Sequence, residues 1–459
     1  MNSHHFFMKS AGLTLAVVLL GGFTPEPAVK ATLRSTAGAP LDSGDVAPGK
    51  LFAREVREPM GKGLVSVSNP TSPQPMAAAL VPETRRSKST MLHVAPGSAA
   101  TQLQLPITAP EDAWVMLIPQ GTDAKVGEDA LRDVAMFDPK GVRADLRAAR
   151  AANSQLGVDT DKLKAEGITK PITMLRMKPE MGKGLYRLQV GPKAAKVGLA
   201  IEIREPSSST ELALTASALQ VAPDAEGYVT VGLQSAEAIE RVSVEATLYT
   251  PRYERDRAVP VVKVGKEYRA MVSRVMTERD EPGTWMVEVH VTGTAGGQAF
   301  DRLEQTAFGF VVPTARLASV GRERLVKDLS GRVAAFEVDV VVESQATDRY
   351  EVTGLLVATD AKGVERTVSQ AQVTDQLGVG SHVLTLRFDA GHVGLSKLGG
   401  SYALRGLQLY SLGTNTLYHR LNRSLDVRFP AVRVEELAAP EMTPAIETMM
   451  RSGEFNLRE

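Results

Sequence analysis

The sequence predicts an all-β protein built from three serial β-sandwich domains, the first with a helical insertion. Its 459 residues allow roughly three domains at about 150 residues each. From Met91 onward, short segments of alternating apolar and polar residues end at Gly or Pro, which is typical of strands joined by tight turns. A unit led by a glycine and an aromatic residue also recurs three times, which indicates repeated modules.

Each recurring unit has a glycine, an aromatic residue two positions later, and then alternating apolar residues. Glycine permits the positive φ of a turn, and the aromatic ring buries a large area where the strand begins. The aromatic residues lie about 100 residues apart, which is the spacing expected of successive sandwich modules. The three pairs are Gly184 and Tyr186, Gly283 and Trp285, and Gly400 and Tyr402.

The N-terminus has the pattern of an export signal. Lys9 precedes an uncharged apolar run over residues 11–23, and Val29 with Ala31 forms a V-x-A cleavage site. The run is too short to span a bilayer comfortably, and a buried N-terminal helix is the alternative. We expect an exported, periplasmic or extracellular protein without a transmembrane segment in the mature chain.

Composition excludes several classes of function. The 53 basic and 53 acidic residues balance, so no electrostatic argument favours nucleic acid or an anionic membrane as a partner. The chain contains no cysteine, which rules out disulfides, cysteine nucleophiles, iron–sulfur clusters and thiolate zinc sites.

The order of segments follows from these patterns and from changes in composition. Residues 32–86 are rich in Ala, Pro, Ser and Gly, and only "GLVSVSN" within them suggests an isolated strand. The predicted segments are a signal peptide over 1–31, a low-complexity linker over 32–86, β-sandwich domains over 87–204, 208–312 and 315–430, and a polar tail over 431–459.

Two helical segments interrupt the β pattern. Val142, Leu146 and Ala149 fall near helical spacing, and Gly157 can end that helix, which we interpret as the insertion in the first domain. In the tail, Thr443 followed by a proline is expected to cap one short helix.

The repeated segment "MGKGL" raises the possibility of a phosphate-binding loop. A P-loop needs Ser or Thr after the lysine and a helix after the loop. Lys62 and Lys183 are each followed by glycine, and a strand is predicted after Gly184. We therefore interpret both copies as turns that lead into strands.

Evidence for catalysis is sparse. Neither H-E-x-x-H nor G-x-S-x-G occurs, and no cofactor is expected. Glu288 and His290 alternate in "VEVHV" and share a strand face, which makes them weak candidates for metal ligands, and we favour an ordinary polar strand face over a metal site. Asp159 and Asp161 only partly match a calcium loop, because Leu163 stands where a third ligand belongs.

The segments "GTWMVEVHVTGTAGGQAFDRLEQTAFGFVVPTARL", "RYEVTGLLVATDAKG" and "LTLRFDAGHVGLSKLGGSYALRGLQLYSLGTNTLYHR" resemble a family of exported bacterial proteins of unknown function. The resemblance covers residues from about 87 to 429 and is strongest in the last two domains. It implies an N-terminal β domain followed by two immunoglobulin-like domains, and it implies no activity or site residues.

We therefore expect a non-enzymatic binding, adhesion or structural protein whose partner is a protein or polysaccharide of the cell envelope or exterior. Sandwich edges and end loops offer surfaces for such contacts. The alternative is a metal-dependent hydrolase, or an accessory subunit of another enzyme, with a site built from loops between domains. Glu288, His290 and the loop near Asp389 are the first candidates for such a site.

Overall fold

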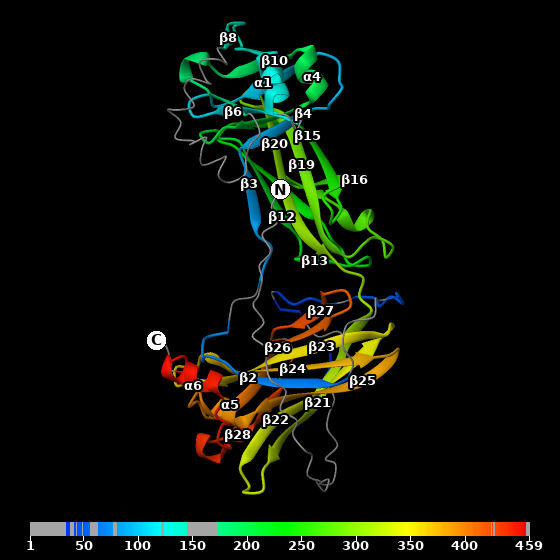
Figure 1. Cartoon of the computed structure of the whole chain (residues 1–459), viewed down its shortest axis with the longest axis vertical. Coiled ribbons are helices and arrows are strands. Elements are labelled where there is room, and N and C mark those ends of the chain that lie inside the picture. Colours follow the sequence, from blue (N-terminus) through cyan, green and yellow to red (C-terminus); the bar gives the residue numbers. More distant parts are fainter. Residues whose placement is uncertain are drawn as a thin grey trace.

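Three β-sandwiches are stacked along the long axis of the molecule (Figure 1). The computed structural model describes residues 34–36, 41–42, 44–47, 49–55, 63–76, 80–120, 124–144, 172–423, 425 and 427–455. Each sandwich encloses its own cluster of buried apolar side chains. The predicted class, serial β-sandwiches made of antiparallel sheets, is confirmed.

The first sandwich pairs two four-stranded sheets, with order β5-β10-β7-β8 and β4-β11-β6-β9. Its core contains Leu105, Val115, Tyr186 and Ile201, all 1% exposed or less. The elements are β4 (Ser89–Val94), β5 (Thr101–Ile107), β6 (Trp114–Pro119), α1 (Ala124–Arg132), β7 (Val134–Phe137), β8 (Arg143–Ala144), β9 (Thr173–Arg176), η1 (Pro179–Met181), β10 (Gly184–Val190), α4 (Pro192–Val197) and β11 (Leu199–Arg204).

The second sandwich pairs two five-stranded sheets, with order β17-β18-β14-β12-β3 and β13-β20-β19-β15-β16. The elements are β3 (Thr84–Ser87), β12 (Glu211–Ala216), β13 (Gln220–Val221), β14 (Val229–Gln234), β15 (Ile239–Tyr249), β16 (Arg255–Val259), β17 (Val261–Val264), β18 (Glu267–Ala270), η2 (Val272–Arg274), β19 (Gly283–Ala295) and β20 (Gln298–Phe310).

The third sandwich pairs a four-stranded sheet, β1-β21-β22-β25, with the sheet β2-β24-β23-β26-β27, in which β28 also pairs with β26. The elements are β1 (Arg34–Ser35), β2 (Val65–Pro70), β21 (Ala315–Lys327), β22 (Val333–Ser344), β23 (Asp348–Thr359), β24 (Glu365–Leu377), β25 (Gly380–Asp389), α5 (Ala390–Gly394), β26 (Gly400–Ser411), β27 (Thr416–Leu421), β28 (Arg428–Val432), η3 (Val434–Glu436) and α6 (Pro444–Arg451).

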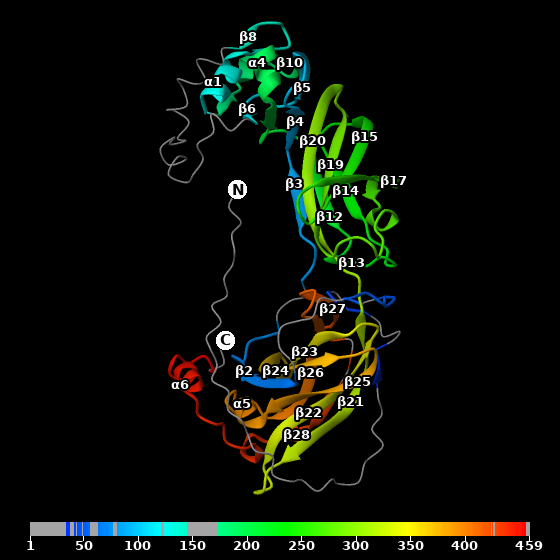
Figure 2. The ribbon, with the colours of Figure 1, turned by 45° about the vertical axis from the view of Figure 1, so that its right-hand side comes forward.

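The described parts of residues 34–76 form a strap on the third sandwich, so the predicted linker over 32–86 is wrong here. Strand β1 pairs with β21, β2 pairs with β24 along its whole length, and Val46 bridges to Arg420. The pairing partners lie about 300 residues further along the chain. Because these strands add to existing sheet edges, they need little apolar sequence of their own. Figure 2 shows β2 beside β24 and the chain rising from it to β3.

The resulting domains are nested rather than simply serial. The chain contributes the strap to the third sandwich, then β3 to the second, and then builds the whole first sandwich. It returns through β12 to the second sandwich and through β21 to the third. The second and third sandwiches are therefore each made from two separated stretches of chain.

The helices differ from those that the sequence predicts. The insertion predicted over residues 142–157 lies mostly outside the described residues, while α1 and α4 occupy other positions in the first sandwich. The cap predicted at Thr443 is confirmed, because its hydroxyl accepts from the amide of Ile446 (3.3 Å). The predicted polar tail begins too early, since buried Val432 and Leu437 belong to the third core.

The three glycine–aromatic units share one geometry, and the predicted positive φ is confirmed at each glycine: 142° at Gly184, 148° at Gly283 and 111° at Gly400. The aromatic rings are at most 2% exposed. Each polar ring group donates to the carbonyl four residues earlier: Tyr186 to Gly182 (2.7 Å), Trp285 to Glu281 (2.8 Å) and Tyr402 to Leu398 (2.6 Å). This bond fixes the ring and the entry of its strand together.

A buried ion pair connects the first and second sandwiches. Arg302 on β20 and Glu205, just after β11, are 1% and 0% exposed, and their Nη1 and Oε2 atoms lie 2.6 Å apart. The guanidinium also donates to Thr108, Ser208 and the carbonyl of Thr210. Because the neighbouring polar groups are satisfied as well, the connection between β11 and β12 forms the centre of an interface between the two sandwiches.

Candidate functional site

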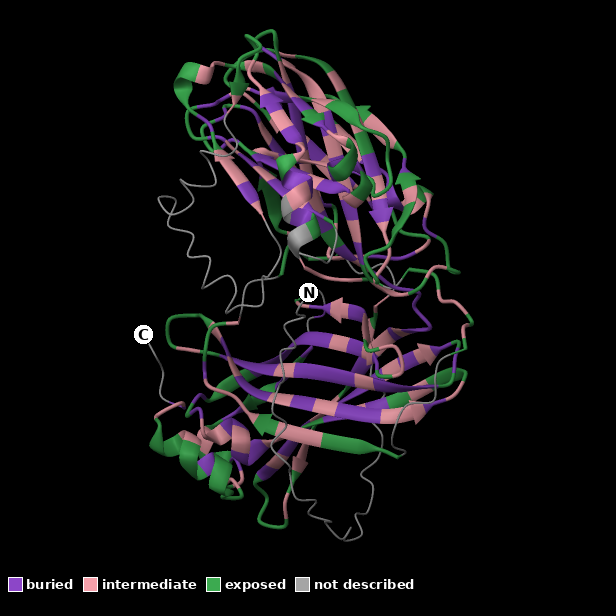
Figure 3. Ribbon diagram, turned by 45° about the horizontal axis from the view of Figure 1, so that its top comes forward, coloured by how far each residue is buried: buried purple, intermediate pink, exposed green. Residues whose placement is uncertain are grey.

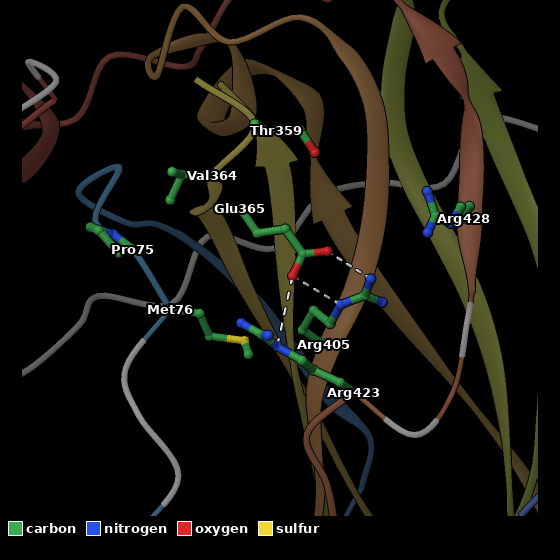
Figure 4. A pocket seen from close by; sticks show the side chains of 9 residues that line it. Pro75, Met76, Thr359, Val364, Glu365, Arg405, Arg423 and Arg428 are labelled. Atoms are coloured by element: carbon green, nitrogen blue, oxygen red, sulfur yellow. Dashed lines mark hydrogen bonds and ion pairs between the residues drawn. The ribbon is translucent and has the colours of Figure 1, made fainter. Parts of the chain in front are cut away.

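A charged pocket opens on the third sandwich, where the strap passes the start of β24 (Figure 4). Its volume is about 520 Å³, which lies within the range of about 300–1,000 Å³ common for small-molecule sites. The lining residues are Pro75, Met76, Thr359, Gly363, Val364, Glu365, Arg405, Arg423 and Arg428.

The turn between β23 and β24 positions one wall of this pocket. The carboxylate of Asp360 accepts from the amides of Lys362 (2.8 Å) and Val364 (2.9 Å). It also accepts from Arg366 Nε (2.6 Å), and this bond is the largest cause that lowers the pKa of Asp360. Gly363 has φ of 80°, which closes the turn before Glu365.

Glu365 and Arg405 form the fixed centre of the pocket. Arg405 donates through Nη2 to Glu365 Oε1 (2.7 Å) and through Nε to Oε2 (3.2 Å), while Nη1 donates to the carbonyl of Leu404 (2.9 Å). The Arg405 side chain is only 7% exposed. This two-point contact holds both side chains in one orientation.

Two further arginines, Arg423 and Arg428, line the same pocket. Arg423 Nε lies 3.9 Å from Glu365 Oε2, and its side chain is 57% exposed. Figure 4 shows the Glu365 carboxylate directed between Arg405 and Arg423, with Arg428 on β28 across the pocket. The described lining therefore holds three arginines and one carboxylate, a set suited to an anionic ligand.

The strap supplies the apolar wall. Pro75 bridges to Arg366, and Thr367 donates its amide to the carbonyl of Gln74 (3.0 Å), so this part of the strap follows β24. Met76 then projects toward Arg423 (Figure 4). The pocket consequently depends on a segment that lies nearly 300 residues before the rest of the site in the sequence.

The residues predicted as metal ligands lie in the second sandwich, far from this pocket in the fold. Glu288 accepts from Tyr249 (3.1 Å) and Gln305 (2.8 Å), whereas His290 Nε2 lies 2.7 Å from Asp301 Oδ1. The hydrogen bond to Asp301 raises the pKa of His290. Glu288 and His290 thus have separate partners, and their role as metal ligands stays a prediction.

Other predicted positions have structural partners or fall outside the description. Asp389 caps α5 by accepting from the amide of His392 (3.1 Å). The Asp159 and Asp161 pair and the first Gly-Lys-Gly copy include residues that the structure does not describe, whereas the second copy is a turn that enters β10. Within the described residues, no group of three or more His, Asp or Glu side chains is arranged to hold a metal.

Sequence reasoning did not find the pocket. Glu365, Arg405, Arg423 and Arg428 follow no recognisable spacing, and arginine is common on any charged surface. The only available signal was the turn segment that begins at Asp360, which the sequence places directly before Glu365. No helix among the described residues has the length and apolar character needed to cross a bilayer.

The fold and the pocket define a multidomain β-sandwich protein with a charged cavity in its last domain. Residues 318–428 match the C-terminal domain of a family described as a domain of unknown function, DUF4785. The expected resemblance to a family of unknown function is thereby confirmed for this domain. No curated protein matches the chain in sequence.

Among solved structures, the chain is similar to a DUF4785 family protein from Legionella pneumophila. The two are 20% identical, the TM-score is 0.60, and the match covers 86% of this chain and 99% of the other. At this identity the likeness shows a shared fold. A match to Salmonella alpha-2-macroglobulin, at 9% identity over 80% of this chain and 24% of the other, has a TM-score of 0.20 and supports no argument.

Proposed function

We propose that this protein is an exported, non-enzymatic binding protein that holds an anionic group in the pocket of its third sandwich. The observation that carries the proposal is a pocket lined by three arginines, two of which flank one oriented carboxylate. Arginine keeps its charge at all physiological pH values, so these groups are suited to holding a ligand rather than to exchanging protons.

The architecture supports a binding role. The Glu205–Arg302 pair fixes the first sandwich on the second, and the strap connects the second with the third through Phe52, whose amide donates to the carbonyl of Pro313 (2.9 Å). Phe52 also packs on the second core. The stacked sandwiches form an elongated molecule (Figure 1), and buried residues alternate with more exposed ones along their strands (Figure 3), so the pocket of the third sandwich is held on a packed scaffold. In keeping with the resemblance, we infer that the second and third sandwiches are immunoglobulin-like.

Binding is tested with the mature chain, residues 32–459, against purified acidic and neutral envelope polysaccharides by isothermal titration calorimetry. We expect binding of acidic polysaccharides that weakens at least tenfold in Arg423→Gln, because one guanidinium of the pocket is lost. Arg252→Gln is the matched control, since Arg252 is an exposed arginine of the second sandwich that pairs with Glu281. Binding of neutral polysaccharides alone, or no loss in Arg423→Gln, would contradict the proposal.

Export has its own test. The apolar run over residues 11–23 and the V-x-A site predict cleavage after Ala31. Mass spectrometry of the protein isolated from its native host should then find a mature chain that begins at Thr32. That cleavage leaves the new N-terminus two residues before β1. An intact Met1 on protein in the cytoplasmic fraction would refute export.

A further inference from the structure

We infer that the pocket recognises a uronic acid unit of a polysaccharide, that is, a sugar ring carrying one carboxylate. The inference rests on the proposed anion-binding function and names the ligand class. It follows from three properties of the pocket: a built-in carboxylate, guanidinium groups on either side of it, and an apolar wall opposite.

The carboxylate of Glu365 argues against a compact, multiply charged anion such as phosphate. Arg405 already matches the charge of Glu365 through two hydrogen bonds, and its Nη1 is engaged by a backbone carbonyl. A phosphate drawn to Arg423 would lie close to a second anion, because Arg423 Nε is 3.9 Å from Glu365. Like charges at such range repel, and the repulsion increases with ligand charge.

A sugar carboxylate satisfies the same groups with a smaller repulsion from Glu365, because it carries a single negative charge. Its single charge can accept two parallel hydrogen bonds from one guanidinium, the geometry for which arginine is suited. Neighbouring ring hydroxyls can then donate to Glu365, because each of its carboxylate oxygens accepts one hydrogen bond from Arg405 and can accept another. The site thus places a guanidinium donor beside the fixed Glu365 acceptor. This arrangement complements a sugar in which a carboxylate lies beside hydroxyl groups.

The remaining lining suits a sugar ring. Pro75, Met76 and Val364 contribute apolar surface to the pocket, and pyranose rings present C–H faces that pack on such surface. Arg423 is 57% exposed, so the pocket opens to solvent on that side and a longer chain can continue out of it. A volume of about 520 Å³ accommodates a small ligand of this size class.

The test compares three probes on the mature chain by calorimetry: a galacturonate trimer, a galactose trimer and inorganic phosphate. We expect the galacturonate trimer to bind at least tenfold more tightly than either other probe. Arg423→Gln should weaken galacturonate binding at least tenfold. Glu365→Gln should reduce the preference for galacturonate over phosphate, because the repelling charge is removed while the side-chain shape is kept.

Met76→Asp provides a variant that leaves the Glu365–Arg405 contact intact. A new negative charge on the apolar wall should abolish galacturonate binding, whereas Arg252→Gln should bind as the parent protein does. A thermal unfolding scan of each variant separates loss of binding from loss of folding.

The outcomes distinguish this inference from the proposed function. Phosphate binding as tight as galacturonate binding, weakened by Arg423→Gln, would overturn the sugar assignment and leave an anion site. Galacturonate binding that none of the pocket variants alters would overturn the assignment to this pocket. Failure of both charged probes, and of every acidic polysaccharide, would overturn both proposals.

Discussion

Three buried aromatic side chains each fix the start of one strand by a single hydrogen bond. Tyr402 illustrates how this hydrogen bond fixes the strand. Its ring is fully buried, and its hydroxyl donates to the carbonyl of Leu398 (2.6 Å). Burial raises the pKa of Tyr402 to about 12, so the hydroxyl remains a donor at any physiological pH. The ring contributes packing, and the hydroxyl fixes its orientation.

Two substitutions separate these contributions. We expect Tyr402→Phe to lower the free energy of unfolding of the third sandwich by about 1–3 kcal/mol, because a buried carbonyl loses its donor. Tyr402→Ala should cost about 3–5 kcal/mol, since a cavity is added. Chemical denaturation measures both, and Tyr253→Phe is the control because Tyr253 is 69% exposed. Equal losses for Tyr402→Phe and Tyr253→Phe would disprove the role of the hydroxyl.

His419 makes the third sandwich sensitive to acid. It is 4% exposed, and its Nδ1 accepts from the amide of Leu317 (3.2 Å), which requires the neutral ring. Burial lowers the pKa of His419 to about 4 in the folded protein. In the unfolded chain its pKa is about 6.5, so between these values the unfolded state binds more protons. Stability is therefore fully present above pH 6.5 and is lost as pH falls toward 4.

The size of this effect follows from the two pKa values. Between pH 7 and pH 5, His419 alone should remove about 2 kcal/mol from the free energy of unfolding. His419→Asn keeps an acceptor near the Leu317 amide but does not titrate, so its loss over the same range should be smaller by about that amount. Denaturation curves at both pH values measure the difference, and parallel losses in the two proteins would contradict it.

At the scale of elements, the sequence predicts a strand in "GLVSVSN", which is β2 of the strap, but it could not predict that the strap belongs to the third sandwich. The aromatic-led strands were predictable because turn, ring and alternation lie within about ten residues of chain. Strand β2 has only six residues, and its partner β24 begins at Glu365. Pairing over such a separation depends on a free sheet edge, which leaves no local pattern. The pocket escaped prediction for the same reason, since Met76 and Arg423 meet only in the fold.

Removing the strap should expose two sheet edges. A chain that starts at Leu80 lacks the six residue pairs of β2 with β24 and the contact of Ser68 with the amide of Asp389 (2.9 Å). At roughly 0.5–1 kcal/mol for each lost backbone hydrogen bond, we expect the third sandwich to lose about 3 kcal/mol or more. Chemical denaturation measures this loss in the free energy of unfolding. Size-exclusion chromatography should show self-association through the exposed edges.

A peptide tests whether the strap acts as a strand added to the sheet. The peptide of residues 63–76, supplied in excess to the shortened chain, should restore the stability that β2 contributes and reduce association, because it covers one of the two exposed edges. A scrambled peptide of the same composition should do neither. If the shortened chain is as stable as the parent and stays monomeric, the strap is not needed for the fold.

At the scale of the whole molecule, the Glu205–Arg302 pair couples the first two sandwiches. Both charges are buried, so the loss of one leaves the other without a partner in a region of low polarity. We expect Arg302→Ala to cost about 3–5 kcal/mol and to separate the unfolding of the first sandwich from that of the second. Arg252→Ala, which breaks an exposed pair with Glu281, should cost about 0–1 kcal/mol.

Differential scanning calorimetry distinguishes coupling from simple destabilisation. In the parent protein the two sandwiches should unfold in one transition, whereas Arg302→Ala should show an earlier, separate transition for the first. Replacing both partners, with Glu205→Leu and Arg302→Met, should recover part of the lost stability, because no charge is then buried alone while the amides of Thr108 and Ala109 lose the Glu205 acceptor. A single transition in Arg302→Ala, merely shifted to lower temperature, would mean that other contacts, such as that of Thr90 with Asp301 (2.6 Å), suffice to join the two sandwiches.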